Sequence, residues 1–242
     1  MLSSTKLCDN KYRGLNGNAL KIIGAFFMII DHIGMLIFPQ VIFLRIVGRL
    51  AYPIFAFFIA EGCRYTRNKA KYLSLLTLFG IIFQLVYSIA TEDYGTVNVI
   101  CSFSLAVGLI YLWQNLLYCC KNKSILNAIV IVILICVYLY LCYNVCAIIY
   151  IDYKFFGIIL PFFAYFTKKK YIRLLLFAIG IFLVARFMGD QFNELQYYSL
   201  LSVVFIAFYN EKRGTIKMKY FFYIFYPIHI VILYGISLLL GK

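Results

Sequence analysis

Two histidines, an aspartate and an arginine interrupt otherwise apolar stretches of this sequence. His32 and His229 are the only histidines in the chain, and Asp31 directly precedes His32. Arg49 lies in the next apolar stretch. Histidine exchanges a proton near neutral pH, arginine can stabilise a developing oxyanion, and a carboxylate can orient either group. If the fold brings these side chains together, their types indicate acyl transfer or proton transfer.

The composition places these groups inside a membrane protein. Hydrophobic residues make up 64% of the 242 residues, and apolar stretches recur with only short polar breaks. No polar segment is long enough to form a soluble domain with its own core. We therefore expect residues 1–242 to form a single integral membrane domain, with residues 1–18 as a cytoplasmic N-terminal segment. The first apolar stretch has no small-residue cleavage pattern, so a removed signal peptide is not expected.

The charge of the chain is strongly positive. A formal net charge of +14 would suit a nucleic-acid partner in a soluble protein. Here the basic residues fall between the apolar stretches, which favours contact with a bilayer that contains anionic lipids. The sequence therefore predicts no nucleic-acid partner.

Nine apolar stretches are candidate membrane spans, which predicts an all-α, polytopic transmembrane helical bundle. The division is least clear in "CYNVCAIIYIDYK", where we expect the polar pair Tyr143 and Asn144 to separate two spans. The expected spans are residues 19–38, 41–62, 71–90, 97–118, 124–142, 146–167, 171–188, 196–210 and 218–240.

Basic residues alternate from one connection to the next. The N-terminal segment and every even-numbered connection are rich in lysine and arginine, whereas the third and seventh connections carry acidic residues. Short cytoplasmic loops carry an excess of lysine and arginine. The pattern predicts a multi-pass protein of the plasma membrane with a cytoplasmic N-terminus and an extracytoplasmic C-terminus.

The predicted directions place the ionisable side chains at similar depths. With a rise of 1.5 Å per residue, Asp31 lies ~18 Å from the cytoplasmic side of a ~30 Å core, and Arg49 lies ~12 Å below the outer side. His229 lies ~14 Å from the cytoplasmic side. Ionisable groups at such depths usually face a bundle interior or a wet cavity. We therefore expect His32, His229 and their two charged neighbours to share one layer.

Structural roles are the alternative for each of these groups. Asp31 and Arg49 could form a buried ion pair that only fixes helix packing, and each histidine could bond a carbonyl of a neighbouring helix. Adjacent helical residues point about 100° apart, so we expect Asp31 to pair with Arg49 or His229 rather than with His32. Arg45, one turn above Arg49, could simply extend toward water.

The sequence shows no metal or soluble-enzyme motif. The eight cysteines lie mostly within or at the ends of apolar stretches, without the Cys/His spacing of a zinc site. No phosphate-binding glycine loop, nucleophile elbow or paired-histidine metal helix is present. We therefore expect no bound metal.

Several segments resemble one family of membrane proteins. "LKIIGAFFMIIDHIG" and "LRIVGRLAYPIFAFFIAEGCRYTRNKAKYL", followed later by "NVICSFSLAVGL" and "KYFFYIFYPIHIVILYGI", are similar in order and spacing to the blocks of the TraX family. This family is named for N-terminal acetylation of a conjugative pilin. The resemblance covers almost the whole chain, and its polar landmarks are Asp31-His32, Gly48-Arg49, Glu61-Gly62, Tyr65 to Asn68 and Pro227-x-His229.

The resemblance implies an acetyl-CoA-dependent O- or N-acetyltransferase. Like other membrane acyltransferases, it would move an acetyl group from cytoplasmic acetyl-CoA to an extracytoplasmic or membrane-delivered acceptor. The acceptor stays open, with a peptide N-terminus, a glycan hydroxyl or a small molecule as the choices.

The implied mechanism assigns roles to particular residues. His32 or His229 would act as general base or carry the acetyl group transiently, Arg49 would stabilise the oxyanion, and Asp31 would tune the set. The CoA phosphates would dock near Arg64, Arg67 and Lys69, and these residues could equally serve only as topology signals. Glu61 could pair with Arg64 or Arg67, or simply end a helix. Asp152 and Arg186 could line an access path for the acceptor.

Two other classes of function stay open. A proton-coupled transporter or channel could use Asp31, His32 and His229 as a relay, although the sequence shows no inverted repeat. A non-catalytic membrane partner of a surface-assembly complex is the third possibility.

Overall fold

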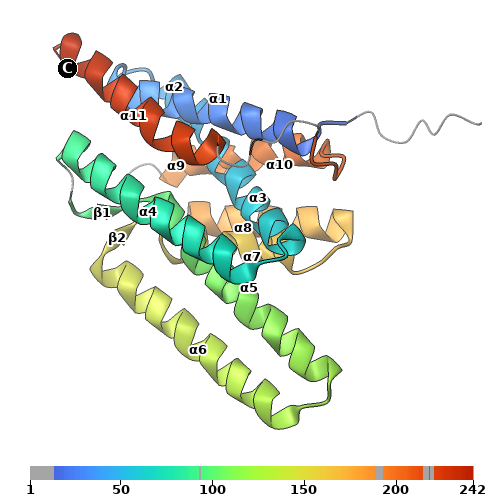
Figure 1. Ribbon diagram of the computed structural model, residues 1–242. Helices are drawn as coiled ribbons and strands as arrows, with labels where there is room; N and C mark the ends of the chain where they lie inside the picture. The colour runs from blue at the N-terminus through green and yellow to red at the C-terminus, as the bar shows by residue number, and fades with distance from the viewer. Residues whose placement is uncertain (1–13, 93, 189–192, 215–217, 219–220, 242) are drawn as a thin grey trace, which may run out of the picture.

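The computed structural model describes residues 14–92, 94–188, 193–214, 218 and 221–241. Within these residues the regular secondary structure is helical apart from two strands of two residues each (Figure 1). In chain order the elements are α1 (Gly17–Leu36), α2 (Ile42–Gly48), α3 (Ala51–Tyr65), α4 (Lys69–Thr91), β1 (Thr96–Val97), α5 (Val99–Lys121), α6 (Ile125–Ile148), β2 (Tyr150–Ile151), α7 (Lys154–Tyr165), α8 (Lys170–Phe187), α9 (Asn193–Gln196), the 3₁₀ helix η1 (Tyr197–Leu201), α10 (Ser202–Ala207) and α11 (Phe221–Leu239).

Helical structure occurs within each of the nine predicted ranges, and α2 and α3 together fill the second. Among the described residues, five segments are long and apolar enough to cross a membrane: Gly17–Leu36, Ile42–Tyr65, Lys69–Ile89, Val99–Lys121 and Ile125–Ile148. Of the other helices, α7 has 12 residues and is only ~18 Å long, and α8 carries Lys170, Arg173 and Arg186. The chain is thus an all-α integral membrane protein, and nine crossings with the stated orientation stay a prediction.

The predicted break at Tyr143 and Asn144 is wrong. α6 continues through both residues, and Asn144 Nδ2 donates a hydrogen bond of 2.8 Å to the carbonyl of Tyr140, one turn earlier in the same helix. A polar side chain that bonds within its own helix need not end it. The chain turns only beyond the end of α6, where Tyr153 adopts a left-handed backbone conformation with a φ of 62°.

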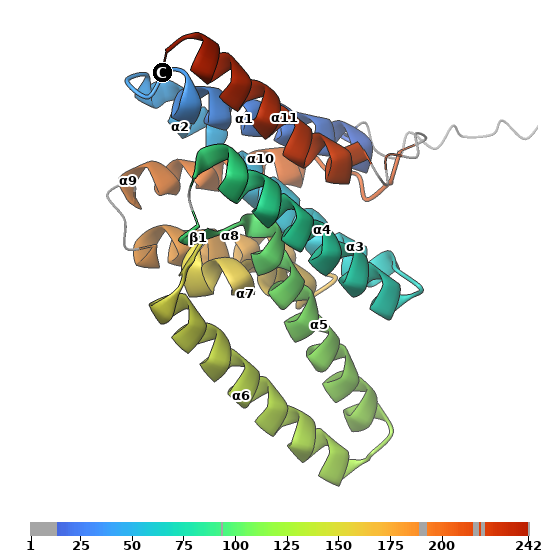
Figure 2. The ribbon, with the colours of Figure 1, turned by 60° about the vertical axis from the view of Figure 1, so that its left-hand side comes forward.

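α3 is the central helix of the bundle. It packs against α1, α5 and α7, and α7 packs in turn against α8. Phe57 of α3 is 1% exposed and meets Phe177 of α8 edge-on, with ring centroids 5.8 Å apart. α1 packs against both α2 and α11, and the three helices lie together in both views (Figures 1 and 2). This arrangement brings the two ends of the chain's helical region side by side.

α5 and α6 form a hairpin that extends away from the other helices (Figure 2). All residues of α6 are described, and only Cys142 among them is buried. A helix that is apolar all round and packs against little protein is typical of a segment surrounded by lipid.

A small parallel pairing joins the connections that follow α4 and α6. β1 pairs with β2, with Thr96 opposite Tyr150. Asn98 caps α5 by accepting a hydrogen bond of 2.9 Å from the backbone N–H of Ile100, and it donates one of 2.9 Å to the carbonyl of Gly80 in α4. The strand pairing and the hydrogen bond from the Asp152 N–H to the Val97 carbonyl, 3.1 Å long, hold the α6–α7 connection beside the cavity described below.

Candidate active site

The structure brings the two histidines together, although they are 197 residues apart in the chain. His32 lies in α1 and His229 in α11, and Nε2 of His229 is 3.0 Å from Nδ1 of His32. The ring centroids are 4.9 Å apart. His229 is 6% exposed and its ring stacks on Phe225. The two imidazoles therefore form one hydrogen-bonded pair in the bundle interior.

Two backbone carbonyls determine which ring nitrogens carry protons in the neutral pair. Nδ1 of His229 lies 2.9 Å from the carbonyl oxygen of Phe225, so it donates, and Nε2 of the same ring is an acceptor. Nδ1 of His32 lies 2.9 Å from the carbonyl of Met28 and within reach of the His229 acceptor, so it also carries its proton. By this assignment Nε2 of His32 holds the free lone pair that a general base needs.

Asp31 forms an ion pair with Arg45 rather than with either partner that the sequence suggested. Arg45 Nη1 lies 3.0 Å from Asp31 Oδ1 and also donates to the Asp31 backbone carbonyl at 3.0 Å. The side chain of Asp31 is 16% exposed and that of Arg45 is 14% exposed, so Arg45 does not extend into water. Gly48 permits this contact, because a Cβ at that position would overlap the Asp31 side chain.

Arg49 is the most buried charge in this part of the molecule. It follows α2 as its C-cap, is 6% exposed, and its Nε has no hydrogen-bond partner within the described chain. Its guanidinium lies close enough to Tyr153, Asp31 and Asp152 to interact electrostatically with each. A buried guanidinium with an unused donor is suited to bind an anion or a developing oxyanion.

A cavity of about 930 Å³ runs beside these groups, within the range of about 300–1,000 Å³ of small-molecule sites. His32, Asp31, Arg45 and Arg49 line one end of it. His229 does not belong to the described lining and lies behind His32. Aromatic side chains line much of the rest, among them Tyr52, Phe55, Phe58, Tyr72, Phe83, Phe103 and Tyr226.

The other end of the same cavity is rich in charge. It is formed where α1 begins, α3 ends, α4 begins and the chain leaves α10. The cationic side chains at this end are Lys21, Arg67, Lys71 and Arg213, and we call these four the basic end. Lys21 and His32 are 11 residues apart in α1, which corresponds to ~16 Å along the helix. One cavity thus connects predicted cytoplasmic loops with the histidine pair.

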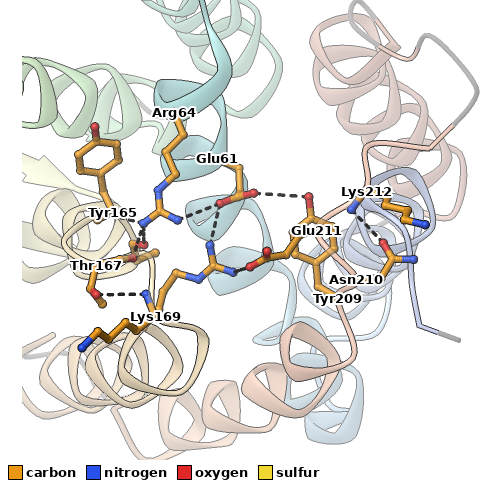
Figure 3. A network of polar contacts seen from close by, with 11 residues as sticks. Glu61, Arg64, Tyr165, Thr167, Lys169, Tyr209, Asn210, Glu211 and Lys212 are labelled. Atoms are coloured by element: carbon orange, nitrogen blue, oxygen red, sulfur yellow. Dashed lines mark hydrogen bonds and ion pairs between the residues drawn. The ribbon is translucent and has the colours of Figure 1, made fainter. Parts of the chain in front are cut away.

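Glu61 lies at the centre of a buried polar network near the basic end (Figure 3). Its Oε1 accepts from Arg173 at 3.0 Å and from Arg64 at 3.4 Å, and its Oε2 accepts from the Tyr209 hydroxyl at 3.4 Å. Arg173 also binds Glu211 at 2.8 Å. The network ties α3 to α8 and to the segment after α10.

The structure places the residues predicted to bind the cofactor in different surroundings. Arg67 lines the cavity, as does Glu61. Arg64 Nη2 instead donates to three carbonyls at the end of α7, those of Ala164, Tyr165 and Thr167, at 2.7, 2.8 and 2.6 Å. Lys69 Nζ lies over the ring of Tyr111, 5.6 Å from its centroid. Neither Arg64 nor Lys69 belongs to the described lining.

The sequence interpretation did not assign Arg173, Lys21 or Arg213 to the site, and it used Arg213 only as part of the charge pattern of the connections. Arg173 is 3% exposed although it lies only a few residues into an apolar stretch. The argument that singled out Arg49, a charge inside an apolar stretch, applies to Arg173 as well. Of the two residues considered for acceptor access, Asp152 lines the cavity and Arg186 is exposed outside it.

Metal ligands are not grouped in the part of the chain that the structure describes. No group of three or more His, Cys, Asp or Glu side chains there could hold a metal ion. The ionisable groups around His32 in the cavity lining are the Asp31 carboxylate and the guanidinium groups of Arg45 and Arg49.

Comparison with known proteins places the chain in a family. The family profile described as "TraX protein" matches residues 16–237. A "probable fimbrial assembly protein FimC, serogroup H1" of Dichelobacter nodosus is 32% identical, over 88% of this chain and 92% of that protein. An uncharacterized protein of Rickettsia prowazekii (strain Madrid E) is 32% identical over 40% of this chain and 37% of its own.

No solved structure matches the chain. The family assignment therefore rests on sequence, and the match extends over α1, α3 and α11, which carry most of the site. Together the profile match and the Dichelobacter relative show that this protein belongs to the TraX family.

Proposed function

We propose that the protein is a plasma-membrane acetyltransferase that moves an acetyl group from cytoplasmic acetyl-CoA to a hydroxyl or amine of an extracytoplasmic or membrane-delivered acceptor. The observation that carries the proposal is the histidine pair, with its 3.0 Å contact, at a cavity that Arg49 also lines. Membership in a family named for pilin acetylation supports the same reaction.

The proposed reaction is a direct transfer. Nε2 of His32 takes the proton of the acceptor as the acceptor's oxygen or nitrogen attacks the thioester carbonyl. Arg49 stabilises the oxyanion of the tetrahedral intermediate. The C–S bond then breaks, the acetyl group stays on the acceptor, and the proton on His32 passes to the departing CoA thiolate. His229 accepts from Nδ1 of His32 throughout and thereby holds the imidazole in the reactive tautomer.

Substitution of the proposed base tests this reaction. The purified wild-type protein and the purified His32→Ala variant would be supplied with labelled acetyl-CoA. In cells that carry either chain, the acetylated acceptor would be identified by mass spectrometry against a deletion strain. General-base catalysis contributes about 10²–10⁴-fold, so His32→Ala should lose acetyl transfer by at least about a hundredfold. Full transfer by His32→Ala would rule out this role.

Proton transport is the second candidate, because the histidine pair and the continuous cavity also suit a relay. Reconstituted vesicles with a pH-sensitive dye separate the two functions. A transporter would move protons without acetyl-CoA, whereas the proposed enzyme would release CoA only when an acceptor is present.

A non-catalytic role in assembly is the third candidate, because the Dichelobacter relative is named as a probable fimbrial assembly protein. If the protein acted only by binding partners, its His32→Ala variant would support surface assembly as well as the wild type does. We expect that variant to be inactive in cells although it is present in the membrane at wild-type level, which a complementation assay with immunoblotting would measure.

A further inference from the structure

We infer that the basic end of the cavity is a phosphate subsite that recognises the nucleotide half of the acyl donor. The inference rests on the proposed function for the identity of the donor, and it assigns Lys21, Lys71 and Arg213, together with Arg67, to the CoA phosphates. The donor would thus be held through its charges at one end of the cavity and react at the other.

The four cations come from three separate parts of the chain. Lys21 lies in α1, and Arg67 and Lys71 flank Asn68, which caps α4 by accepting from the Lys71 backbone N–H at 2.9 Å. Arg213 belongs to the segment after α10. Their convergence on one cavity indicates a binding site rather than a run of charge in a single loop.

Backbone hydrogen bonds hold the Arg213 segment against the start of α1. The N–H of Gly17 donates to the carbonyl of Lys212 at 2.7 Å, and the N–H of Leu15 donates to the carbonyl of Phe208 at 2.9 Å. In return, the N–H of Asn210 donates to the carbonyl of Leu15 at 3.0 Å. These bonds keep Arg213 on the same side of the cavity as the N-terminal part of α1.

Two carboxylates also line this end, and both are paired with arginines outside the lining. Glu61 pairs with Arg173 and Arg64, and Glu211 pairs with Arg173. Among the described residues, the four cations and these two arginines outnumber the two carboxylates by four charges. The diphosphate and 3′-phosphate of CoA together carry about four negative charges near pH 7. The charges of the site and the ligand therefore match.

The length of the cavity fits the donor as well. Along α1, Lys21 and His32 are separated by ~16 Å. The pantetheine arm joins the CoA diphosphate to sulfur through about 12 covalent bonds, as many as four extended residues, or ~14 Å. Phosphates held at the basic end would therefore place the thioester beside His32 and Arg49.

Binding measurements on the full-length protein in detergent test the subsite. Calorimetry would compare CoA with pantetheine, which lacks every phosphate, for the wild type, Lys71→Ala, Arg213→Ala and Lys212→Ala. Because hydrogen bonds to charged groups are strong, we expect Lys71→Ala and Arg213→Ala each to weaken CoA binding about tenfold and to leave pantetheine binding unchanged. Lys212 lies next to Arg213 but outside the described lining, so Lys212→Ala is the matched control and should bind CoA like the wild type.

Charge-preserving variants guard against misfolding. Lys71→Arg and Arg213→Lys should restore most of the CoA affinity, and raised salt should weaken CoA binding more than pantetheine binding. The inference is overturned if the wild type binds pantetheine as tightly as CoA. It is also overturned if Arg213→Ala and Lys212→Ala behave alike.

The subsite and the proposed function can fail separately. If CoA binding follows the expected pattern but no acetyl group is transferred, the subsite stands and the proposed function falls. If S-acetylpantetheine and acetyl-CoA are used with equal KM and acetyl transfer occurs, the proposed function stands and the subsite falls.

Discussion

At the scale of single residues, the two histidines have different surroundings and so different tasks. His32 lines the cavity, whereas His229 lies behind it and is fixed by the Phe225 carbonyl. Because Nδ1 of His229 donates to that carbonyl, Nε2 of His229 is left to accept from Nδ1 of His32. The pair is therefore directional, and in the proposed reaction His229 is a positioning residue and His32 is the group that meets the acceptor.

The directional pair predicts unequal effects of substitution. In His229→Ala, Nδ1 of His32 keeps its bond to the Met28 carbonyl, so we expect kcat to fall about tenfold, less than in His32→Ala. KM for acetyl-CoA should not change, since His229 does not line the described cavity. His229→Gln, whose amide oxygen can accept from His32, should recover part of kcat. Steady-state kinetics would measure both constants, and an increase in KM would contradict the positioning role.

At the scale of elements, close contacts between helices hold the charged groups in place. α2 approaches α1 at Gly48, next to the pair formed by Asp31 and Arg45. α3 is joined to the end of α7 by Arg64 and to α8 by Glu61 and Arg173. Polar and ionic bonds thus cross the helix interfaces where the cavity wall is built.

Gly48→Ala should lower stability by about 1–3 kcal/mol, because its methyl group would overlap Asp31 and force α1 and α2 apart. Thermal unfolding in detergent would measure the change. Gly235→Ala in α11 is the control, since its Cβ would meet nothing within 4 Å and alanine favours helix. Equal stability of the Gly48 variant and the wild type would show that α1 and α2 can move apart without a loss of stability.

Arg64→Ala should also be destabilising, by about 2–3 kcal/mol, because it removes a charged donor from three carbonyls at the end of α7. Arg64→Lys should be intermediate, since an ammonium lacks the planar fork of the guanidinium. The exposed Arg186→Ala should stay within about 0.5 kcal/mol. If Arg64→Lys keeps its stability but loses CoA affinity, the sequence-based assignment of Arg64 to the phosphates is favoured.

At the scale of the whole molecule, the fold joins a loop-proximal charged region to a buried reactive region through one cavity. This arrangement suits transfer between two sides of a membrane only if the two ends face opposite sides. The predicted orientation meets that condition, with the basic end cytoplasmic.

Cysteine labelling tests the orientation. Cys120 lies near the end of α5 and Cys146 near the end of α6, at opposite ends of the same hairpin. In single-cysteine variants of intact cells, a membrane-impermeant maleimide should label Cys146, and Cys120 should react only after permeabilisation. The reverse labelling would place the basic end outside and contradict the donor side that we propose.

The sequence predicted the helical class and a common layer for the reactive residues, but not their partners. The layer follows from the rise of each helix, and the structure does bring His32 and His229 together, whereas their depth in the membrane stays a prediction. Pairing depends on rotation about each helix axis and on close packing, which is why Asp31 meets Arg45 instead of Arg49. The predicted break at Asn144 is wrong for a local reason, because its side-chain amide donates a hydrogen bond to the Tyr140 carbonyl within α6.

The continuous cavity has a further consequence for the cell. A cavity that runs from the start of α1 to the α6–α7 connection, lined by charged and aromatic side chains, is also a route by which water and protons could cross the bilayer and dissipate an ion gradient. If the two ends open at the two membrane surfaces, at least one of them must be closed whenever the donor is absent. CoA would fill the cavity, so a bound donor would itself block the passage of water and protons. In the empty protein, only the aromatic side chains of the lining would limit this leak across the membrane.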